Sequence, residues 1–344
     1  MTTVGAGGAA RTGPELRPLL EDGSLVVSAD PGVLETVEPW LPRRLPAHPS
    51  PHPAPAGIAV EPGPVAWALP PGEPAMRLYD VRAWVPGGEE RAVLADLHGG
   101  IGARVELAGA RAEVRIDAGG GGPAARDVFA TLTIAAALLL TRLRRALVHA
   151  AAVVAPGGGA WLLPGGSFNG KTTTCSTLIR GGWDYLCDDH VVLGLAPAGA
   201  LLAEGWPRPF HLDLGYQAGV PEGVRARVDP DSFAPGRWRR TAPVAGLLFP
   251  RVDADLPTAL SPLRPAAALG RLLRESPWLL ADPAAAAPVL ALLERAARLP
   301  AYELRLGRDC YRDETRLRAA LAPALDRMEG RDPLAPAGEM APTA

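Results

Sequence analysis

The chain has 344 residues, enough to bury a sizeable core and to form about two domains. Its 35 basic and 37 acidic residues give a net charge of -2, so no global positive field favours nucleic acid or an anionic membrane as a partner. The three cysteines are odd in number and form no C-x-x-C pair, which argues against a disulfide framework and a structural zinc site.

Residues 1–122 show few signs of a single regular domain. Residues 1–14 contain no apolar core of signal-peptide length, so we expect a disordered tail and a cytoplasmic protein. Residues 15–122 are expected to form a β-rich N-terminal region, with a short strand at 23–28. Within it, prolines recur so densely over 41–74 that we expect a linker or surface loop with little regular structure, and a docking segment for a partner stays open.

Alternation of apolar and polar residues predicts strands in the second half of this region. The strands are expected at 76–85, 91–97, 103–107 and 112–117, with Gly-rich turns between them. Val105, Leu107, Val114 and Ile116 alternate with charged residues, as one buried and one exposed face require. The pattern predicts a small antiparallel meander.

Residues 123–328 are expected to form a second domain, followed by a disordered tail at 329–344. Pro123 is favourable in the first turn of a helix that we expect to run to about Ala146. Its apolar stretch, 128–140, has 13 residues, whereas a membrane span needs roughly 18, so we expect a buried helix and no membrane contact. Residues 147–155 and 160–163 then predict a hairpin.

A phosphate-binding motif follows this hairpin. Gly165, Gly166, Ser167, Phe168, Asn169, Gly170, Lys171 and Thr172 fit the pattern G-x-x-x-x-G-K-[ST], with Thr173 next in a helix predicted over 172–179 and ended by Gly181-Gly182. Backbone N–H groups of such a loop bind phosphates, while the lysine reaches the terminal phosphates and the hydroxyl of Thr172 ligates Mg²⁺. Lys171 is the only lysine in the sequence, in a chain that otherwise uses arginine. We therefore expect ATP and Mg²⁺ as cofactors.

Two adjacent acids follow at 17 and 18 residues after Lys171, on a strand predicted over 183–195. One helix and a return strand fit this spacing, so Asp188 and Asp189 are expected beside the loop. Since neighbours on a strand point to opposite faces, one acid is expected to face the site and the other to turn toward the helix end or a second metal contact. A turn or cap is the alternative role for this pair, and a place in the core is the alternative for His149 on the preceding hairpin.

The remaining elements are expected to complete the second domain. A strand before Glu204 leads to a Trp-Pro-Arg-Pro segment with Arg208, and a loop over 217–243 holds Arg237, Arg239 and Arg240, as a solvated cluster or a contact for an anionic substrate. Strands are predicted at 244–249 and 302–306, and helices at 263–275, 283–299 and 312–328.

His149, the 165–172 loop and the Asp188-Asp189 pair, in this order, resemble the catalytic domain of the HPr kinase/phosphorylase family and its peptide-modifying relatives, within the phosphoenolpyruvate-carboxykinase-like superfamily. The resemblance covers about residues 145–310. It implies that Asp188 is the general base and that His149 orients or charges it. It also implies that Glu204, with Thr172 and Asp189, binds metal, and that Arg208 lies near the phosphates. Phe168 stands where the family has a small residue, and the family's longer signature after the second strand is absent.

The sequence as a whole predicts an α+β protein, with a mixed sheet and flanking helices in the second domain. We expect an ATP·Mg-dependent phosphotransferase that acts on a Ser or Thr hydroxyl of a protein or peptide. A kinase for a small metabolite and a non-catalytic nucleotide sensor are the alternatives. The sequence leaves a homo-oligomer open.

Overall fold

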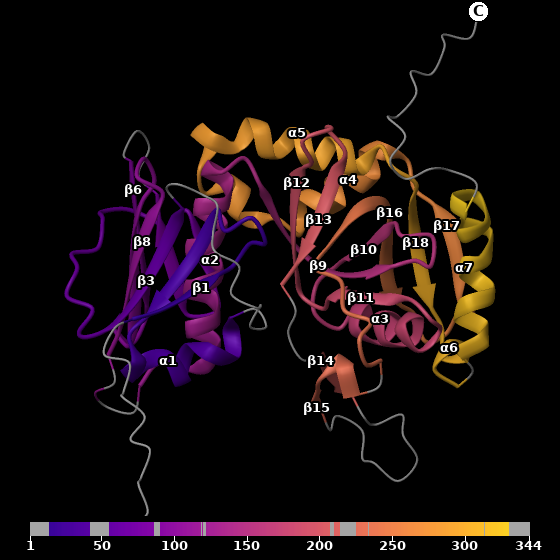
Figure 1. The fold of residues 1–344 in the computed structure, drawn as a ribbon, viewed down its shortest axis with the longest axis horizontal. Coiled ribbons are helices and arrows are strands. Elements are labelled where there is room, and N and C mark those ends of the chain that lie inside the picture. The colour runs from indigo at the N-terminus through magenta and orange to yellow at the C-terminus, as the bar shows by residue number, and fades with distance from the viewer. Residues whose placement is uncertain are drawn as a thin grey trace, which may run out of the picture.

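The computed structural model describes residues 14–41, 55–85, 90–117, 119, 122–206, 210–213, 225–232, 234–312 and 314–329. These residues form two large sheets, a two-stranded hairpin and several helices (Figure 1). The predicted α+β class, with mixed sheets flanked by helices, is confirmed. Nearly all of the two predicted tails lies outside the described residues.

The first sheet contains eight strands in the order β1-β2-β3-β8-β7-β6-β5-β4. They are β1 (Glu15–Pro18), β2 (Leu25–Ala29), β3 (Ala56–Pro62), β4 (Met76–Leu78), β5 (Val81–Trp84), β6 (Arg91–Asp96), β7 (Ile101–Glu106) and β8 (Arg111–Ile116). Strand β3 pairs in parallel with β2 and β8, while β4 to β8 form successive antiparallel pairs. The predicted meander is thus confirmed as one part of a larger mixed sheet.

The prediction of little regular structure over 41–74 is wrong for β3. Residues 56–61 contain no proline, and Ala56, Ile58 and Val60 are buried at every second position. The prolines at 55 and 62 flank this run, where they remove few ladder hydrogen bonds. Residues 42–54, the densest proline stretch, lie outside the described residues.

The single strand predicted over 76–85 is wrong as well, because the chain reverses inside it. Strands β4 and β5 pair antiparallel around a two-residue turn at Tyr79 and Asp80, with Leu78 opposite Val81. Tyr79 has a φ of 53°, in the left-handed region that such tight hairpin turns require. Sequence alternation continued through the turn and concealed it.

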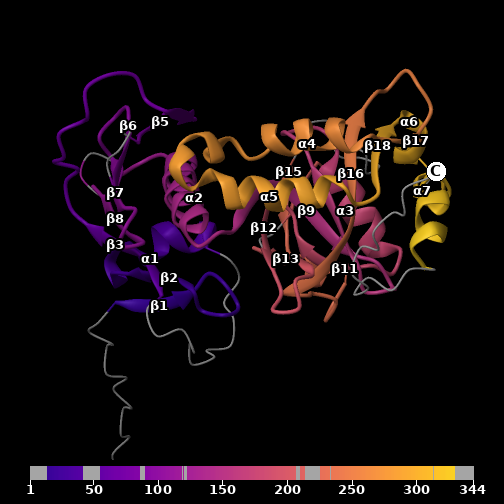
Figure 2. The ribbon, with the colours of Figure 1, turned by 90° about the horizontal axis from the view of Figure 1, so that it is seen from above.

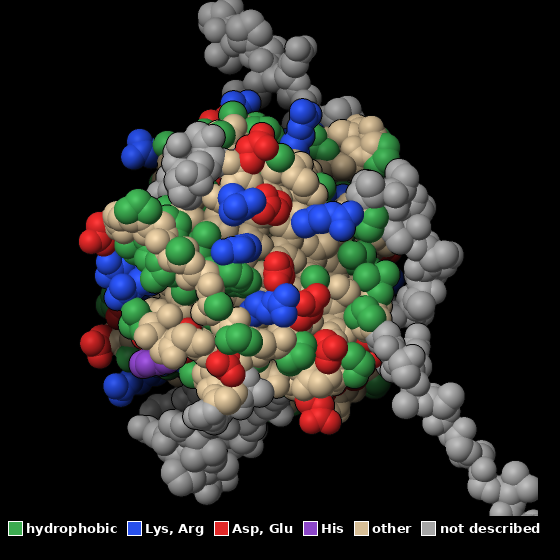
Figure 3. All heavy atoms as spheres, turned by 90° about the vertical axis from the view of Figure 1, so that its left-hand side faces the viewer, with side chains coloured by type: hydrophobic (Ala, Val, Ile, Leu, Met, Phe, Trp, Pro, Cys, Tyr) green, Lys and Arg blue, Asp and Glu red, His purple; other side chains and the backbone are tan. Residues whose placement is uncertain are grey.

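Part of the Pro-rich segment packs across the face of the first sheet that points away from the rest of the molecule. Val65 and Trp67 lie over Gly102 of β7, where a Cβ atom would come within 2.6 Å of a Val65 methyl group. The Arg104 guanidinium lies 5.1 Å from the Trp67 ring centroid. Figure 3 shows this side of the molecule, where basic and acidic side chains are interspersed.

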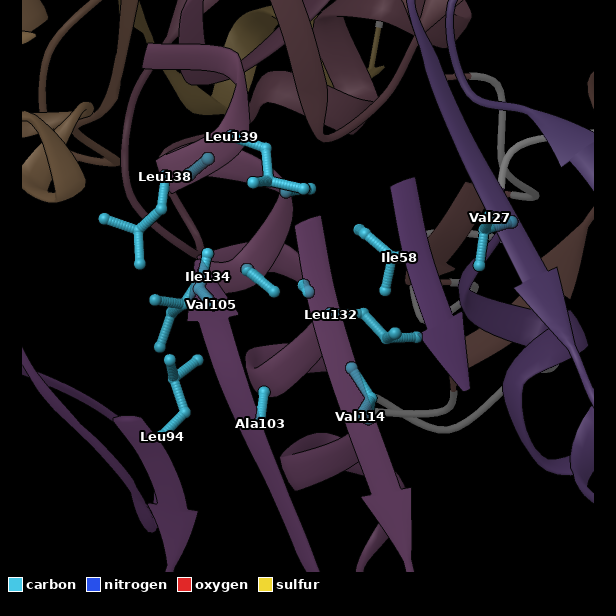
Figure 4. Close-up of a cluster of buried hydrophobic side chains, with 14 of the residues drawn as sticks. Val27, Ile58, Leu94, Ala103, Val105, Val114, Leu132, Ile134, Leu138 and Leu139 are labelled. Carbon is cyan, nitrogen blue, oxygen red and sulfur yellow. The ribbon is translucent and has the colours of Figure 1, made fainter. Parts of the chain in front are cut away.

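Helix α2 (Ala125–Arg142) covers the other face of the first sheet (Figures 1 and 2). Figure 4 shows Leu132, Ile134, Leu138 and Leu139 of this helix with apolar side chains of the strands. The predicted buried helix over 128–140 is confirmed, since nearly every residue of this stretch is buried. None of the helices in the described part of the chain combines the length and apolarity that crossing a bilayer requires.

Helix α2 ends four residues before the predicted limit of Ala146. Arg144 adopts a φ of 56°, and the N–H of Arg145 donates to the carbonyl of Leu140 at 2.8 Å, a hydrogen bond typical of helix ends. The apolar core around α2 also includes Leu147, Val192 and Trp206 of the second half of the chain. The domain boundary predicted near residue 123 stays a prediction, because this helix contacts both halves.

The second sheet has the strand order β10-β9-β12-β13-β16-β18-β17, and β11 adds to β9. The strands are β9 (Ala146–Val154), β10 (Ala160–Pro164), β11 (Asp184–Cys187), β12 (His190–Leu195), β13 (Leu201–Gly205), β16 (Thr241–Val252), β17 (Ala259–Pro262) and β18 (Ala301–Leu306). Strand β10 pairs with both β9 and β16, so five of the strands close into a ring. The predicted hairpin of residues 147–155 and 160–163 is confirmed as β9 and β10.

Helix α1 (Pro31–Val37) packs with the first sheet, and the other elements lie around the second (Figure 1). The remaining helices are α3 (Lys171–Arg180), α4 (Pro265–Arg274), α5 (Ala286–Ala297), α6 (Arg308–Arg312) and α7 (Glu314–Glu329), and β14 (Phe210–Asp213) pairs with β15 (Arg225–Val228). Helices α3, α4, α5 and α7 occur where the sequence predicts them. The strand β15 falls inside the loop predicted over 217–243, where polar residues and glycines hide it.

Gly205, at the end of β13, is required by the close approach of β11. A Cβ atom there would lie 2.3 Å from the carbonyl oxygen of Leu186, which belongs to the backbone and cannot rotate away. We predict that Gly205→Ala lowers the free energy of unfolding by about 1–3 kcal/mol, measured by urea denaturation.

The matched control is Gly270→Ala in α4, where nothing lies within 4 Å of the added Cβ atom. Alanine is the better helix former, so this variant should gain about 0.5–1 kcal/mol. Equal stabilities for the Gly205 variant and the wild type would contradict the packing described for β11.

Candidate functional site

The phosphate-binding motif lies between the buried strand β10 and helix α3. Gly170 adopts a φ of 89° and is the N-cap of α3, which begins at Lys171. Only a residue without Cβ adopts this conformation readily, and it turns the chain from the loop into the helix. Helix α3 ends at Gly181, as predicted. The strand, loop and helix that the motif needs are therefore all present.

Lys171 is the central residue of the loop. Its side chain is buried, and its ammonium group donates a hydrogen bond to the carbonyl of Gly166 at 3.0 Å and another to the carbonyl of Gly165. The ammonium nitrogen also lies 3.3 Å from Nε2 of His149. Burial lowers the pKa of Lys171, while the charges of Asp189 and Asp188 oppose this shift. The loop thus curls around the one lysine of the chain.

Phe168 lies at the outer turn of the loop. Its φ of 67° is in the left-handed region, and its side chain is 79% exposed. The neighbouring Asn169 side chain folds back to Gly165, where a Cβ atom would come within 3.1 Å of it. The large residue at position 168 therefore points away from the interior of the loop and leaves its curl intact.

The single strand predicted over 183–195 is wrong, since it breaks at the two acids. Strand β11 pairs with residues 152–154 of β9, with a register shift between Tyr185 and Cys187, and β12 pairs with residues 146–149. Asp188 and Asp189 occupy this break, and the carbonyl of Asp189 accepts the N–H of Ala150 at 3.0 Å. The charges of both acids act on Lys171, so both lie near the loop.

Asp189 lies between two histidines. One carboxylate oxygen is 3.1 Å from Nε2 of His149 and the other is 3.1 Å from Nδ1 of His190. Burial would raise the pKa of Asp189, but the charge of His190 and the hydrogen bonds from both histidines hold it well below its usual range. Asp189 is therefore ionised at neutral pH.

Asp188 has the opposite electrostatic environment. It is 7% exposed, and burial together with the negative charge of Asp189 raises its pKa to about 7, against a hydrogen bond from Thr172. Its Oδ1 atom is buried and has no hydrogen-bond partner among the described residues. A carboxyl group near neutral pKa, with one oxygen available, can accept a proton at physiological pH.

His149 is held from both sides of its ring. While Nε2 faces Asp189, Nδ1 lies 3.3 Å from a carboxylate oxygen of Glu275. Burial would lower the pKa of His149, but the hydrogen bonds to Asp189 and Glu275 outweigh it and raise the pKa to about 9. The ring is therefore a cation at neutral pH, beside the ammonium of Lys171.

Two residues of this cluster, His190 and Glu275, are not predicted as site residues from the sequence. His190 directly follows the acid pair, and this position could have identified it as a site residue. Its ring is buried, with its centroid 5.5 Å from that of Phe129 and 6.1 Å from that of Trp206. Glu275 lies 126 positions after His149 in the chain, and no sequence pattern connects the two residues.

Glu204, expected as a metal ligand, does not join the cluster. Its carboxylate accepts hydrogen bonds from Arg240 at 2.8 Å and from the backbone N–H of Glu21 at 2.6 Å. These contacts connect the second sheet to the N-terminal strands. Arg240 is accordingly a buried ion-pair partner, and Arg239 pairs with Asp184 at 2.7 Å, so neither shows the contact with an anionic substrate left open above. Arg208 lies outside the described residues.

The chain was compared with protein-family models, curated proteins and solved structures. No protein-family model and no curated protein matches the sequence. Among solved structures, the Hpr(Ser) kinase/phosphatase from Coxiella burnetii is similar over 54% of this chain and 99% of its own, with 13% identity and a TM-score of 0.31. A likeness of this size is distant, and the function of the chain has to follow from its own residues.

The opposite shifts of the two acids predict opposite effects on stability. Because the pKa of Asp188 is raised to about 7 from 3.8, the folded state loses stability as the pH rises from about 4 to about 7. Asp188→Asn removes this penalty, so we predict that it raises the free energy of unfolding by about 1–2 kcal/mol at pH 8, and by less at pH 5.

Asp189→Asn is the matched comparison and should have the opposite sign. It removes the ionised partner of two histidines and should lower the free energy of unfolding by about 1–2 kcal/mol at pH 7. The loss is smaller than for a fully buried pair because 32% of the side chain is exposed. Urea denaturation measures Asp188→Asn at pH 5 and pH 8 and Asp189→Asn at pH 7. A loss of stability in Asp188→Asn at pH 8 would contradict the raised pKa described for Asp188.

Proposed function

We propose that this protein is an ATP·Mg-dependent kinase that transfers a phosphoryl group to a hydroxyl of a protein or peptide. The observation that carries the proposal is the position of Asp188. This buried carboxyl group, with a pKa near 7, lies beside Thr172 and Lys171 of a complete phosphate-binding loop. Phosphoryl transfer needs such a loop, a metal ligand, an acid and cations, and the cluster contains each of them.

The loop fits a nucleotide triphosphate. Lys171 donates to two loop carbonyls, and these weak acceptors are replaceable by phosphate oxygens, which form stronger charge-assisted bonds. The N-terminus of α3, a helix of ten residues, points at the same place and favours negative charge. His149 adds a second positive charge 3.3 Å from the ammonium nitrogen. These groups together can stabilise the charge on a transferring phosphoryl group.

Mg²⁺ fits the oxygen atoms beside the loop. The hydroxyl of Thr172 and the carboxylate of Asp189 are the hard ligands that Mg²⁺ prefers, and Asp189 stays ionised. The described residues contain no group of three or more His, Cys, Asp or Glu side chains that could hold a metal. This suits Mg²⁺, which commonly binds through one or two protein ligands, waters and substrate phosphates. When bound, the ion would neutralise charge on the phosphates.

Asp188 fits the general base of this reaction. Its available carboxylate oxygen would accept the proton of the acceptor hydroxyl as the hydroxyl oxygen bonds to the terminal phosphorus. The bond from that phosphorus to the bridging oxygen breaks, and ADP leaves with the bridging oxygen. Asp189, held by two histidines, keeps its charge throughout and repels any second negative charge on Asp188.

The acceptor class follows from the resemblance of His149, the loop and the acid pair to the HPr kinase/phosphorylase family. A Ser or Thr hydroxyl of a protein or peptide is therefore the proposed acceptor. A small metabolite would use the same groups, and a non-catalytic sensor would use only the loop. From the sequence we still expect a cytoplasmic protein that binds neither nucleic acid nor membrane. A homo-oligomer remains an open alternative.

Lys171 offers a test of nucleotide binding. We predict that Lys171→Ala abolishes the rise in melting temperature that ATP·Mg gives the wild type, because binding at 100 times Kd is worth about 2.7 kcal/mol. Lys171→Arg should also lose most of the rise, since a planar guanidinium does not fit where the slim ammonium meets two carbonyls. A full rise in Lys171→Ala would contradict the nucleotide site.

Asp188 offers a test of transfer as distinct from binding. We predict that Asp188→Asn keeps the thermal shift with ATP·Mg but lowers transfer of labelled phosphate by about 10²–10⁴-fold, the range that a general base contributes. Mixed Ser/Thr peptides serve as acceptors, and water serves as the acceptor for slow hydrolysis. A thermal shift without turnover in either protein would favour the sensor.

A further inference from the structure

Glu275 lies beside the part of the β9 edge that β10 does not pair with. Strand β10 pairs with β9 only as far as Ala150, opposite Pro164, and the chain then departs into the loop. Beyond that point the N–H of His149 donates to the backbone carbonyl of Glu275 at 2.8 Å. The residue after helix α4 therefore takes over the hydrogen bonding of β9 where β10 stops.

The segment that follows Glu275 is fixed at two more points, once to β9 and once to the end of α2. The indole N–H of Trp278 donates to the carbonyl of Leu147 at 2.5 Å, and Asp282 forms two hydrogen bonds with Arg142, at 2.7 and 3.1 Å. The N–H of Glu275 itself bonds to the last turn of α4. The backbone of Glu275 is thus held in place independently of its side chain.

This fixed backbone directs the Glu275 carboxylate to the ring of His149. One carboxylate oxygen lies 3.3 Å from Nδ1, while Asp189 lies 3.1 Å from Nε2 on the other edge of the ring. An imidazole ring held at one nitrogen can still rotate about its bond to Cβ, whereas acceptors at both nitrogens leave one orientation. The two carboxylates together determine how His149 meets the loop.

We infer that Glu275 is a positioning residue for phosphoryl transfer, which fixes the ring of His149 against Asp189 and Lys171. The inference rests on the proposed function. Among the described residues, Glu275 contacts the ring and the backbone of His149 and the end of α4, while its charge reaches Lys171 only through space. Its loss should therefore affect turnover far more than nucleotide affinity.

The experiment compares Glu275→Gln, Glu275→Asp and Glu294→Gln, in the wild-type and the His149→Ala background. Glu294 is an exposed residue of α5 and is the matched control. Hydrolysis of ATP·Mg gives kcat and KM, and titration with a fluorescent ATP analogue gives affinity. We expect Glu275→Gln to lower kcat by about 10–100-fold, since a misplaced group near the reacting atoms has an effect of this size. The KM of Glu275→Gln should stay within about two-fold of the wild-type value. The kcat of Glu275→Asp should lie between those of the wild type and Glu275→Gln, and Glu294→Gln should have the wild-type kcat.

The His149→Ala background separates positioning from general damage. If Glu275 acts through the ring, Glu275→Gln has no further effect on kcat once the ring is gone, because residues that act as a unit are not additive. Unchanged kcat in Glu275→Gln, or equal losses in kcat and affinity, would overturn the inference.

A wild type without any turnover would refute the proposed function instead. The contact is then decided by urea denaturation of the same four proteins, namely the wild type, Glu275→Gln, His149→Ala and the double variant. Additive losses of stability would overturn the contact between the two side chains, and a smaller loss in the double variant than the sum would support it.

Discussion

The site depends on one interaction, the contact of the ionised Asp189 carboxylate with His149 and His190. Each of its oxygens lies 3.1 Å from a ring nitrogen, so a single side chain joins residues of β9 and β12 at the break between β11 and β12. The break itself lets the acid reach both rings, because a regular strand would have directed Asp188 and Asp189 to opposite faces. The irregular register beside β9 is thus a requirement of the site and not a defect of the sheet.

From this charge the electrostatics of the neighbouring groups follow. A fixed negative charge next to Asp188 makes ionisation of a second, more deeply buried carboxyl group unfavourable, so the pKa values of two residues adjacent in sequence move in opposite directions. Pairs of acids whose environments separate their pKa values commonly have different roles in catalysis. Here the same charge also keeps His149 protonated, with Glu275 on its other side, and so places a second cation beside Lys171. One ion therefore influences the protonation of two neighbours, Asp188 and His149.

The sequence predicts the parts of this site whose signal is local, and it misses those that depend on distant pairing. The glycines and lysine of the loop lie within eight residues, and the hairpin before them alternates visibly, so both are predictable. The break at Asp188 depends on how β9 pairs with two strands, which no local pattern records. Glu275 reaches His149 only because β10 ends at Pro164 and leaves an edge of β9 to be covered. In the same way, Glu204 was expected near the metal, although its partners are Arg240, just before β16, and Glu21, in the turn between β1 and β2.

The N-terminal strands and α2 belong physically to the site, even though no sequence motif connects them to it. The ring of His190 packs against Phe129 of α2, which in turn contacts Trp40 and Tyr79 at centroid distances of 5.6 and 6.3 Å. These rings shield one side of His190 from water, which would otherwise weaken its ion pair with Asp189. The buried pair of Arg240 and Glu204 fixes the same interface through the backbone of Leu19 and Glu21. The interaction between a carboxylate and two histidines is strongest where water is absent. By excluding water, the N-terminal strands and α2 therefore contribute to the electrostatics of the site.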